Sequence, residues 1–173
     1  MVSYSTLFGN GITHQLRVDY FVHERWSLLY NAGYAYRAPT AGFVADDSYR
    51  EYRAPLGLSL GVAVTGVVFA GCSYSGGDGV FNFIMLTSLI PDGVAYHIAA
   101  SERLDISPYL LLSGLTYQIN GENDGQFVYA PMAGLRLLYH LNDTFVISAE
   151  QNIKRGADDE IIPSAGATLA IVF

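Results

Sequence analysis

Residues 161–173 read Ile161-Ile162-Pro163-Ser164-Ala165-Gly166-Ala167-Thr168-Leu169-Ala170-Ile171-Val172-Phe173. The odd positions are apolar, whereas Ser164, Gly166 and Thr168 between them are small or polar. Alternation with a period of two predicts a β-strand with one apolar face. A soluble sheet rarely finishes on an aromatic residue such as Phe173, whereas a strand that closes a membrane barrel does so routinely. The stretch therefore predicts a strand that faces lipid on one side.

The composition fits a membrane barrel. The chain has 173 residues, which suits one domain over residues 1–173. Charged residues make up only 14%, against about 25% in a typical soluble domain. No apolar run reaches the roughly 18 residues of a transmembrane helix, so the barrel is the other structure that satisfies its backbone in lipid. Thirteen tyrosines fit the aromatic girdles of such barrels.

Charge and cysteine usage exclude several functions. The net charge of −7 argues against nucleic-acid binding, which needs a basic footprint. Cys72 is the single cysteine, so it forms no internal disulfide and gives no metal-binding spacing, and we expect no cofactor or metal. The first alternating segment follows Met1 without a signal peptide, so we interpret the sequence as the mature form of an exported protein. A cytosolic all-β protein is the alternative, but it would leave the apolar strand faces unexplained.

The same alternation recurs along the chain. The clearest case is 52–65, where large apolar residues alternate with small or polar ones. The pattern predicts an all-β, transmembrane, antiparallel up-and-down β-barrel of about ten strands, or eight if the first hairpin is irregular. The expected strands are 2–8, 12–22, 25–37, 52–65, 67–75, 93–100, 104–118, 126–141, 144–154 and 161–173.

The expected connections fall into a short set and a long set. Bacterial barrels have tight turns on the periplasmic side and longer loops outside. The short turns are 23–25, 65–66, 101–103 and 142–143, and the long loops are 38–51, 76–92, 119–126 and 154–160.

One predicted outer loop is unusually apolar. Residues 79–93 do not alternate, and they end in the turn Pro91-Asp92-Gly93. We expect either a short interfacial helix or an extension of the barrel wall. Exposed apolar patches often mark interaction sites, so this segment is a candidate docking surface for a lipid, a partner protein or a lid, with wall packing as the alternative. Its candidate residues are Phe81, Phe83, Ile84, Met85, Leu86, Leu89 and Ile90.

Charged residues share the side of the strands that carries glycine, which places them in the lumen. They must pair there, because an unpaired buried charge costs several kcal/mol. Large side chains fill a barrel of this size, so we expect a salt-bridged, plugged interior. A narrow polar channel and an internal ligand site are the alternatives. The predicted network comprises Arg17, Asp19, Arg53, His97, Asp105, Arg136, His140 and Glu150.

Signals for catalysis are weak. Ser148, Glu150 and His140 lie on neighbouring predicted strands, but no Gly-x-Ser-x-Gly elbow occurs, and a nucleophile and its base must be within hydrogen-bond reach. His14 is expected on the lipid-facing side of its strand near an outer turn, so we interpret it as a residue at the membrane interface and not as a catalytic base. Acidic clusters at 46–47, 122–124 and 158–160 are expected to be solvated loop charges, although oxygen ligands of this kind can bind Ca²⁺. We therefore expect a protein that is not an enzyme.

The whole chain resembles the small β-barrel proteins of the Gram-negative outer membrane. Its strand–turn–strand texture carries the resemblance, together with Phe173, whose setting resembles the C-terminal signal for barrel insertion. The stretch Ile-Pro-Asp-Gly-Val-Ala-Tyr-His at 90–97 is similar to small outer-membrane proteins of the Bacteroidota. The resemblance implies contact with outer-membrane lipid and lipopolysaccharide, and with the barrel-assembly machinery during insertion.

Fold alone does not choose among the functions of this class. The first hypothesis is a non-enzymatic structural barrel or an accessory subunit that binds an envelope protein partner. The alternatives are a porin-like narrow pore for ions or small solutes and a lipid-modifying enzyme.

Overall fold

The computed structural model describes residues 1–9, 11–36, 50–71, 77–112, 115–120, 124–155 and 161–173. Two helices and a set of strand segments make up this part of the chain. The helices are α1 (Leu56–Gly71) and α2 (Gly77–Thr87). The strands are β1 (Val2–Phe8), β2 (Ile12–His23), β3 (Trp26–Tyr36), β4 (Arg50–Arg53), β5 (Gly93–Tyr96), β6 (Ile98–Ala99), β7 (Leu104–Leu111), β8 (Leu115–Asn120), β9 (Asp124–Tyr129), β10 (Met132–His140), β11 (Phe145–Arg155) and β12 (Ile161–Ile171).

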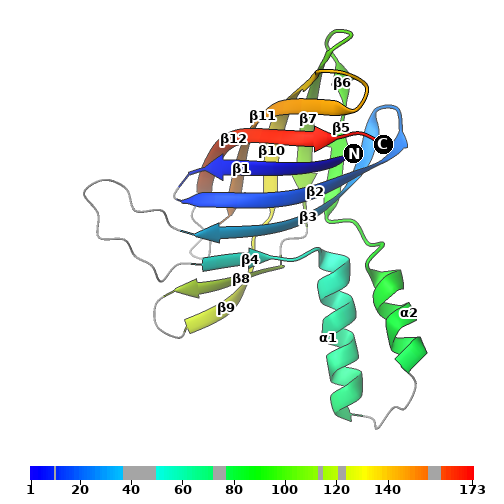
Figure 1. Ribbon diagram of the computed structural model, residues 1–173. Helices are drawn as coiled ribbons and strands as arrows, with labels where there is room; N and C mark the ends of the chain where they lie inside the picture. The colour runs from blue at the N-terminus through cyan, green and yellow to red at the C-terminus, as the bar shows by residue number, and fades with distance from the viewer. Residues whose placement is uncertain (10, 37–49, 72–76, 113–114, 121–123, 156–160) are drawn as a thin grey trace.

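The wall closes into an antiparallel barrel, because β1 pairs with both β2 and β12 while β2 also pairs with β3 (Figure 1). Several segments are parts of one long strand. β7 continues into β8, β9 continues into β10, and β4, β5 and β6 occupy one position between β3 and β7/β8. The described segments therefore fill eight strand positions, and the prediction of ten strands is not supported. Eight was the alternative, but the first hairpin pairs regularly, and the two missing strands are those predicted at 52–65 and 67–75.

The two extra predicted strands, 52–65 and 67–75, are replaced largely by one helix. Residues 52–65 are strand only as far as Arg53, and α1 takes up 56–65 together with 67–71. The predicted turn at 65–66 is wrong because it lies inside α1, and 76–92 is not an outer loop. α2 covers residues 79–87 of the segment 79–93, so the interpretation of that stretch as a short helix is confirmed over those residues. The fold is thus the predicted all-β, closed antiparallel barrel with a helical hairpin inserted into its wall, and the prediction did not include α1.

Close packing of small residues explains why 56–71 is helical. Gly57 and Gly61 alternate with large residues as in a strand, but their spacing of four also puts them on one face of a helix. A Cβ added to Gly57 would collide with the carbonyl oxygen of Thr87, and one on Gly61 would collide with the Thr87 hydroxyl. The backbones of α1 and α2 therefore approach closely through these glycines.

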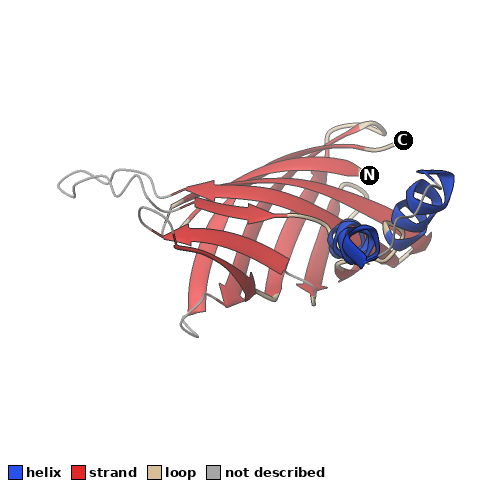
Figure 2. Ribbon diagram, turned by 90° about the horizontal axis from the view of Figure 1, so that it is seen from below, coloured by secondary structure: helices blue, strands red, loops and turns tan. Residues whose placement is uncertain are grey.

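The helical hairpin, residues 54–91, which we call the arm, leaves the wall in the middle of a strand. β3 pairs with β5 up to Leu29, opposite Gly93, and with β4 from Gly33, opposite Arg53. The arm is inserted between these two pairings. Figures 1 and 2 show α1 and α2 side by side, standing away from the barrel and running across the strand direction.

Neither helix is long and apolar enough over its described residues to cross a membrane.

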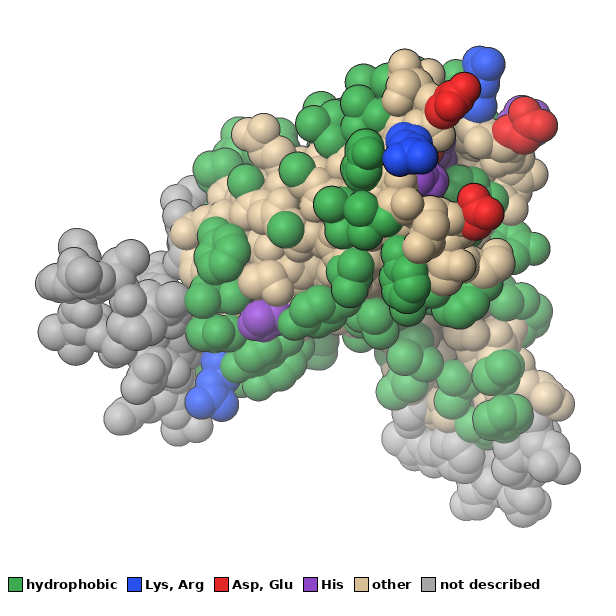
Figure 3. Space-filling view, turned by 45° about the horizontal axis from the view of Figure 1, so that its top comes forward, with side chains coloured by type: hydrophobic (Ala, Val, Ile, Leu, Met, Phe, Trp, Pro, Cys, Tyr) green, Lys and Arg blue, Asp and Glu red, His purple; other side chains and the backbone are tan. Residues whose placement is uncertain are grey.

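Apolar and polar side chains alternate between the outer and inner faces of the wall, as predicted. On β10, Leu135 and Leu137 are exposed on the outside, whereas Arg136 is fully buried inside. The same alternation on β11 points Ile147 outward and Glu150 inward. Figure 3 shows hydrophobic side chains spread over the outer surface, while charged ones gather at the end with the short turns and near the undescribed residues.

Candidate functional site

The centre of the lumen holds a buried ion pair between β2 and β11. Arg17 donates from Nη2 to Glu150 Oε1 at 2.9 Å and from Nη1 to Glu150 Oε2 at 3.2 Å. Neither side chain is accessible to solvent. Two parallel hydrogen bonds of this kind are the strong, geometrically specific form of a carboxylate pair. Arg17 Nη2 also donates to Gln15 Oε1 at 3.1 Å.

Glu150 collects further donors from three other strands. The Tyr109 hydroxyl on β7 donates to Glu150 Oε1 at 2.5 Å, and the Asn152 amide donates to the same atom at 3.3 Å. Ser5 on β1 and Thr168 on β12 donate to Oε2 at 3.5 and 3.4 Å. Counting β2, hydrogen bonds from four strands other than β11 thus converge on one carboxylate and tie opposite sides of the barrel together.

A second buried pair lies toward the end with the short turns. Arg136 donates from Nη2 and Nη1 to the two carboxylate oxygens of Asp19, at 2.7 and 3.1 Å. Ser27 donates to Asp19 Oδ1 at 3.5 Å and shares a hydrogen bond of 2.9 Å with His97 Nε2. The Tyr109 ring lies between the two pairs, 4.4 Å from the Arg17 guanidinium and 5.5 Å from that of Arg136.

A third group fills the lumen at the end opposite the short turns. Lys154 on β11 bonds both carboxylate oxygens of Glu51 on β4, at 2.8 and 2.7 Å. Gln118 also donates to Glu51, at 3.4 Å. Among the residues that the structure describes, Arg53 is in no ion pair; its guanidinium donates to the carbonyl oxygen of Ala130 and lies 4.0 Å from Met132 Sδ.

The remaining predicted network residues lie near the mouth by the short turns. His140 Nε2 is 3.0 Å from Asp105 Oδ2, and both side chains are partly exposed. The structure therefore separates the predicted set into local groups. Glu51, Lys154 and Tyr109 are major members that the sequence reasoning did not include.

The weak catalytic set is not assembled. Ser148 Oγ is buried and has no hydrogen-bond partner within the described residues, while His140 contacts Asp105 and Glu150 contacts Arg17. His14 lies on the outer surface and stacks on Tyr4. The acidic clusters at 46–47, 122–123 and 158–160 lie outside the described residues. In the part of the chain that is described, no three metal-binding side chains come together.

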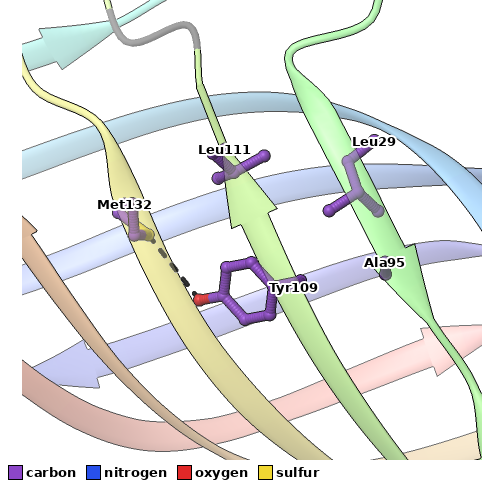
Figure 4. Packing of buried hydrophobic residues seen from close by; sticks show 5 residues of the cluster. All are labelled: Leu29, Ala95, Tyr109, Leu111 and Met132. Carbon is purple, nitrogen blue, oxygen red and sulfur yellow. Dashed lines mark hydrogen bonds between the residues drawn. The ribbon is translucent and has the colours of Figure 1, made fainter.

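Apolar side chains fill the space between the charged groups. Leu29, Ala95, Tyr109, Leu111 and Met132 form one buried cluster inside the wall (Figure 4). A second cluster of Leu138, Val146 and Ala170 packs with Met1 and Val172 near the chain termini. The lumen is thus packed with side chains at several levels.

Asp92 fixes the base of the arm to the barrel. Its carboxylate accepts hydrogen bonds from the backbone N–H of Leu56, the first residue of α1, at 2.6 Å and from that of Asn31 on β3 at 2.5 Å. An acceptor at this position satisfies a free N–H of the helix terminus. On the outer face, the Tyr30 hydroxyl donates to the carbonyl oxygen of Leu89 at 2.9 Å.

The arm exposes most of the apolar residues that the sequence singled out. The side chains of Phe81, Leu86 and Leu89 are each more than 60% exposed. Ile84 differs, because it faces Gly61 in the contact between the two helices. Exposed apolar residues also occur along α1, a helix that the sequence analysis did not predict. They are Leu58, Leu60, Val62 and Val64.

Comparisons with known proteins show the fold. No family model matches the chain, and no curated protein sequence matches it. The structure of Ail, the attachment invasion locus protein of Yersinia pestis, matches with a TM-score of 0.51 at 12% identity, over 99% of this chain and 93% of that one. A designed transmembrane β-barrel matches with a TM-score of 0.50 at 12% identity, over 99% and 92%. This chain therefore has the fold of a small outer-membrane β-barrel, and neither match supports the bacterial phylum suggested by residues 90–97.

Proposed function

We propose that this protein is a non-catalytic barrel of the bacterial outer membrane that serves as an accessory subunit of an envelope complex. The barrel anchors the chain, and the arm provides the surface that a partner contacts. One observation carries this proposal: a lumen filled by ion pairs is combined with an apolar helical hairpin that is built into the wall. Anchoring alone does not require such an insertion.

The packed lumen argues against the porin-like alternative. A pore needs a continuous polar path, but Arg17 and Arg136 are fully buried in their ion pairs. The cluster around Leu138 and Val146 adds an apolar barrier near the chain termini. The separation of Ser148 from a histidine partner argues in the same way against a lipid-modifying enzyme.

The test is extraction of the natively expressed protein in mild detergent, followed by size and mass analysis with and without boiling. We expect a heat-modifiable barrel in an assembly larger than the monomer, with a stoichiometric envelope partner. A monodisperse monomer without a partner would contradict the accessory-subunit role and leave the barrel itself unaffected.

The strand pairing of the wall shows how the arm can be deleted. Only three residues of β3, Tyr30–Ala32, lie between the partner of Arg53 and the partner of Gly93. A three-residue segment in place of 54–92, with its middle side chain pointing inward, should therefore restore an uninterrupted strand. We expect this variant to keep its heat-modifiable migration and to lose the partner.

A matched control changes the barrel wall and keeps the arm. Leu135→Ala with Leu137→Ala removes apolar surface from the outer face of β10, where both side chains are exposed. We expect the control to retain the partner. If the variant without the arm also retains it, the arm is not the contact surface and the proposal is wrong.

A further inference from the structure

The position of the arm along the barrel indicates what surrounds it. Its base lies beside Tyr30–Ala32, near the middle of β3. Toward the short turns, Trp26 and Tyr96 are in ring contact at 4.8 Å, and toward the loops Tyr34 and Tyr52 are in ring contact at 5.1 Å. Aromatic residues of this kind mark the two interfaces of a membrane barrel, with the apolar band between them. The arm therefore leaves the wall within the level of the hydrocarbon layer.

The surface of the arm is apolar on several sides. On α1, Leu58, Leu60, Val62 and Val64 are exposed, and consecutive members of this series project in different directions because a helix turns once every 3.6 residues. α2 adds Phe81, Met85 and Leu86. A helix that is hydrophobic all round belongs in a protein core or in a membrane. Asp78 is the only charged residue in the sequence between Arg53 and Asp92.

The packing between the helices has the arrangement found in membranes. The small residues Gly57 and Gly61 of α1 lie in the contact with Thr87 and Ile84 of α2, while most of the large apolar side chains on the described parts of both helices are exposed. A helical hairpin in water would bury the large side chains and expose polar ones. In lipid the large side chains gain nothing by leaving the acyl chains, so small residues that allow close backbone approach occupy the interface.

We infer that the arm is embedded in the hydrocarbon layer, lying along the bilayer beside the barrel, with lipid acyl chains as its surroundings. α1 has 16 residues and is therefore about 24 Å long at 1.5 Å per residue. It runs across the strand direction (Figure 1), so it extends the protein sideways in the membrane. The lipid contact is continuous with the outer face of the barrel. This inference depends on the proposed membrane location and describes the barrel without its partner, since a partner bound to the arm within the membrane would replace part of this lipid.

The experiment measures the depth of single sites on the arm. In a Cys72→Ser background, Val62→Cys and Leu86→Cys place one environment-sensitive fluorophore on each helix at exposed positions. The labelled proteins are reconstituted into phosphatidylcholine vesicles that carry nitroxide quenchers at shallow, intermediate or deep acyl positions. Iodide is the aqueous quencher. Two control sites are Leu135→Cys on the outer face of β10 and Glu102→Cys in an exposed short turn.

We expect labels at 62 and 86 to be quenched most by the deep nitroxide, like the label at 135. Iodide should quench them several-fold less than the label at 102. Strong iodide quenching at 62 and 86 would place the arm in water, and strongest quenching by the shallow nitroxide would place it at the interface. Protection from both quenchers would show that protein covers the arm. Each of these three results would overturn the inference, while unchanged quenching at 135 would leave the barrel location intact.

Discussion

Glu150→Leu should strongly destabilise the barrel. The change removes the carboxylate that receives two hydrogen bonds from Arg17 and one from Tyr109, and it leaves a guanidinium that solvent does not reach. Removing one partner of a buried ion pair costs about 3–5 kcal/mol. A folded protein is stable by about 5–15 kcal/mol, so much of its stability is at risk. Urea unfolding in lipid vesicles, followed by heat-modifiable migration, measures the free energy of unfolding.

Replacing the arginine of the pair should lower the free energy of unfolding by less than replacing the glutamate does. Arg17→Met leaves Glu150 with Tyr109 and Asn152 as donors, and a carboxyl group can bind a proton, whereas an arginine stays charged. The double variant Arg17→Met with Glu150→Leu removes both charges, so its loss should fall short of the sum of the single losses by about 2 kcal/mol or more.

Gln151→Ala is the control for this cycle, because Gln151 is next to Glu150 in the sequence but its side chain lies exposed on the outer face of β11. Its effect should remain within about 0.5 kcal/mol. The expected stabilisation by the ion pair is refuted if the losses in unfolding free energy of the two single variants add up to that of the double variant. It is also refuted if Glu150→Leu destabilises the barrel no more than Gln151→Ala does. In either case the Arg17–Glu150 ion pair does not stabilise the barrel.

Three further changes test other parts of the structure. Gly61→Leu should force α1 away from Thr87, making the arm of the detergent-extracted protein more sensitive to protease than that of the wild type while the barrel stays heat-modifiable; equal resistance in the same detergent would contradict the close packing. Asp92→Ala should destabilise the protein by about 1–3 kcal/mol for each backbone donor that it orphans, those of Asn31 and Leu56, and Asp92→Asn should recover part of this loss in the same urea assay. The wild-type barrel should show no discrete conductance in planar bilayers, and regular single-channel steps would reinstate the pore.

Alternation along the sequence predicted the charged lumen well because it is a local property of strands. Asp19 and Arg136 have inward parity on β2 and β10, and closing the barrel brings them within 2.7 Å. The sequence could not choose the pairs. Whether Arg17 meets Asp19 or Glu150 depends on the register around the whole barrel, which no local pattern contains.

The first helix of the arm, α1, was missed because its alternation fits two structures. Residues 56–65 place small residues at every second position, and that set includes the two glycines four residues apart that a helix pair needs. Short apolar runs cannot be assigned to helix or strand by periodicity alone. The signals that could have found the helix are Pro55 at its start, the Gly57–Gly61 spacing and the scarcity of charge between Arg53 and Asp92.

Other site residues had weaker signals. Glu51 shares the parity of Arg53 on β4, and Lys154 shares that of Glu150 on β11, so extending each predicted inward face by one step would have included both. Tyr109 has inward parity too, but an aromatic residue there gives no sign that its hydroxyl bonds a carboxylate. Asp92 appeared only as part of a turn, because its role depends on a gap in the wall that the sequence did not predict.

Asp92 explains how a membrane barrel tolerates an insertion in the middle of a strand. In lipid, unpaired backbone groups at such a gap would be costly. The N–H of Asp92 donates to Leu29 at 2.7 Å, and its carbonyl oxygen accepts from Leu112 at 2.9 Å, so its backbone bridges the two neighbouring strands. Its carboxylate meanwhile accepts from Asn31 and from Leu56 at the start of α1. One residue thus closes the wall and caps the helix, which means that the arm cannot swing freely without disturbing the barrel. A partner bound to the arm would therefore be held in a defined orientation to the barrel.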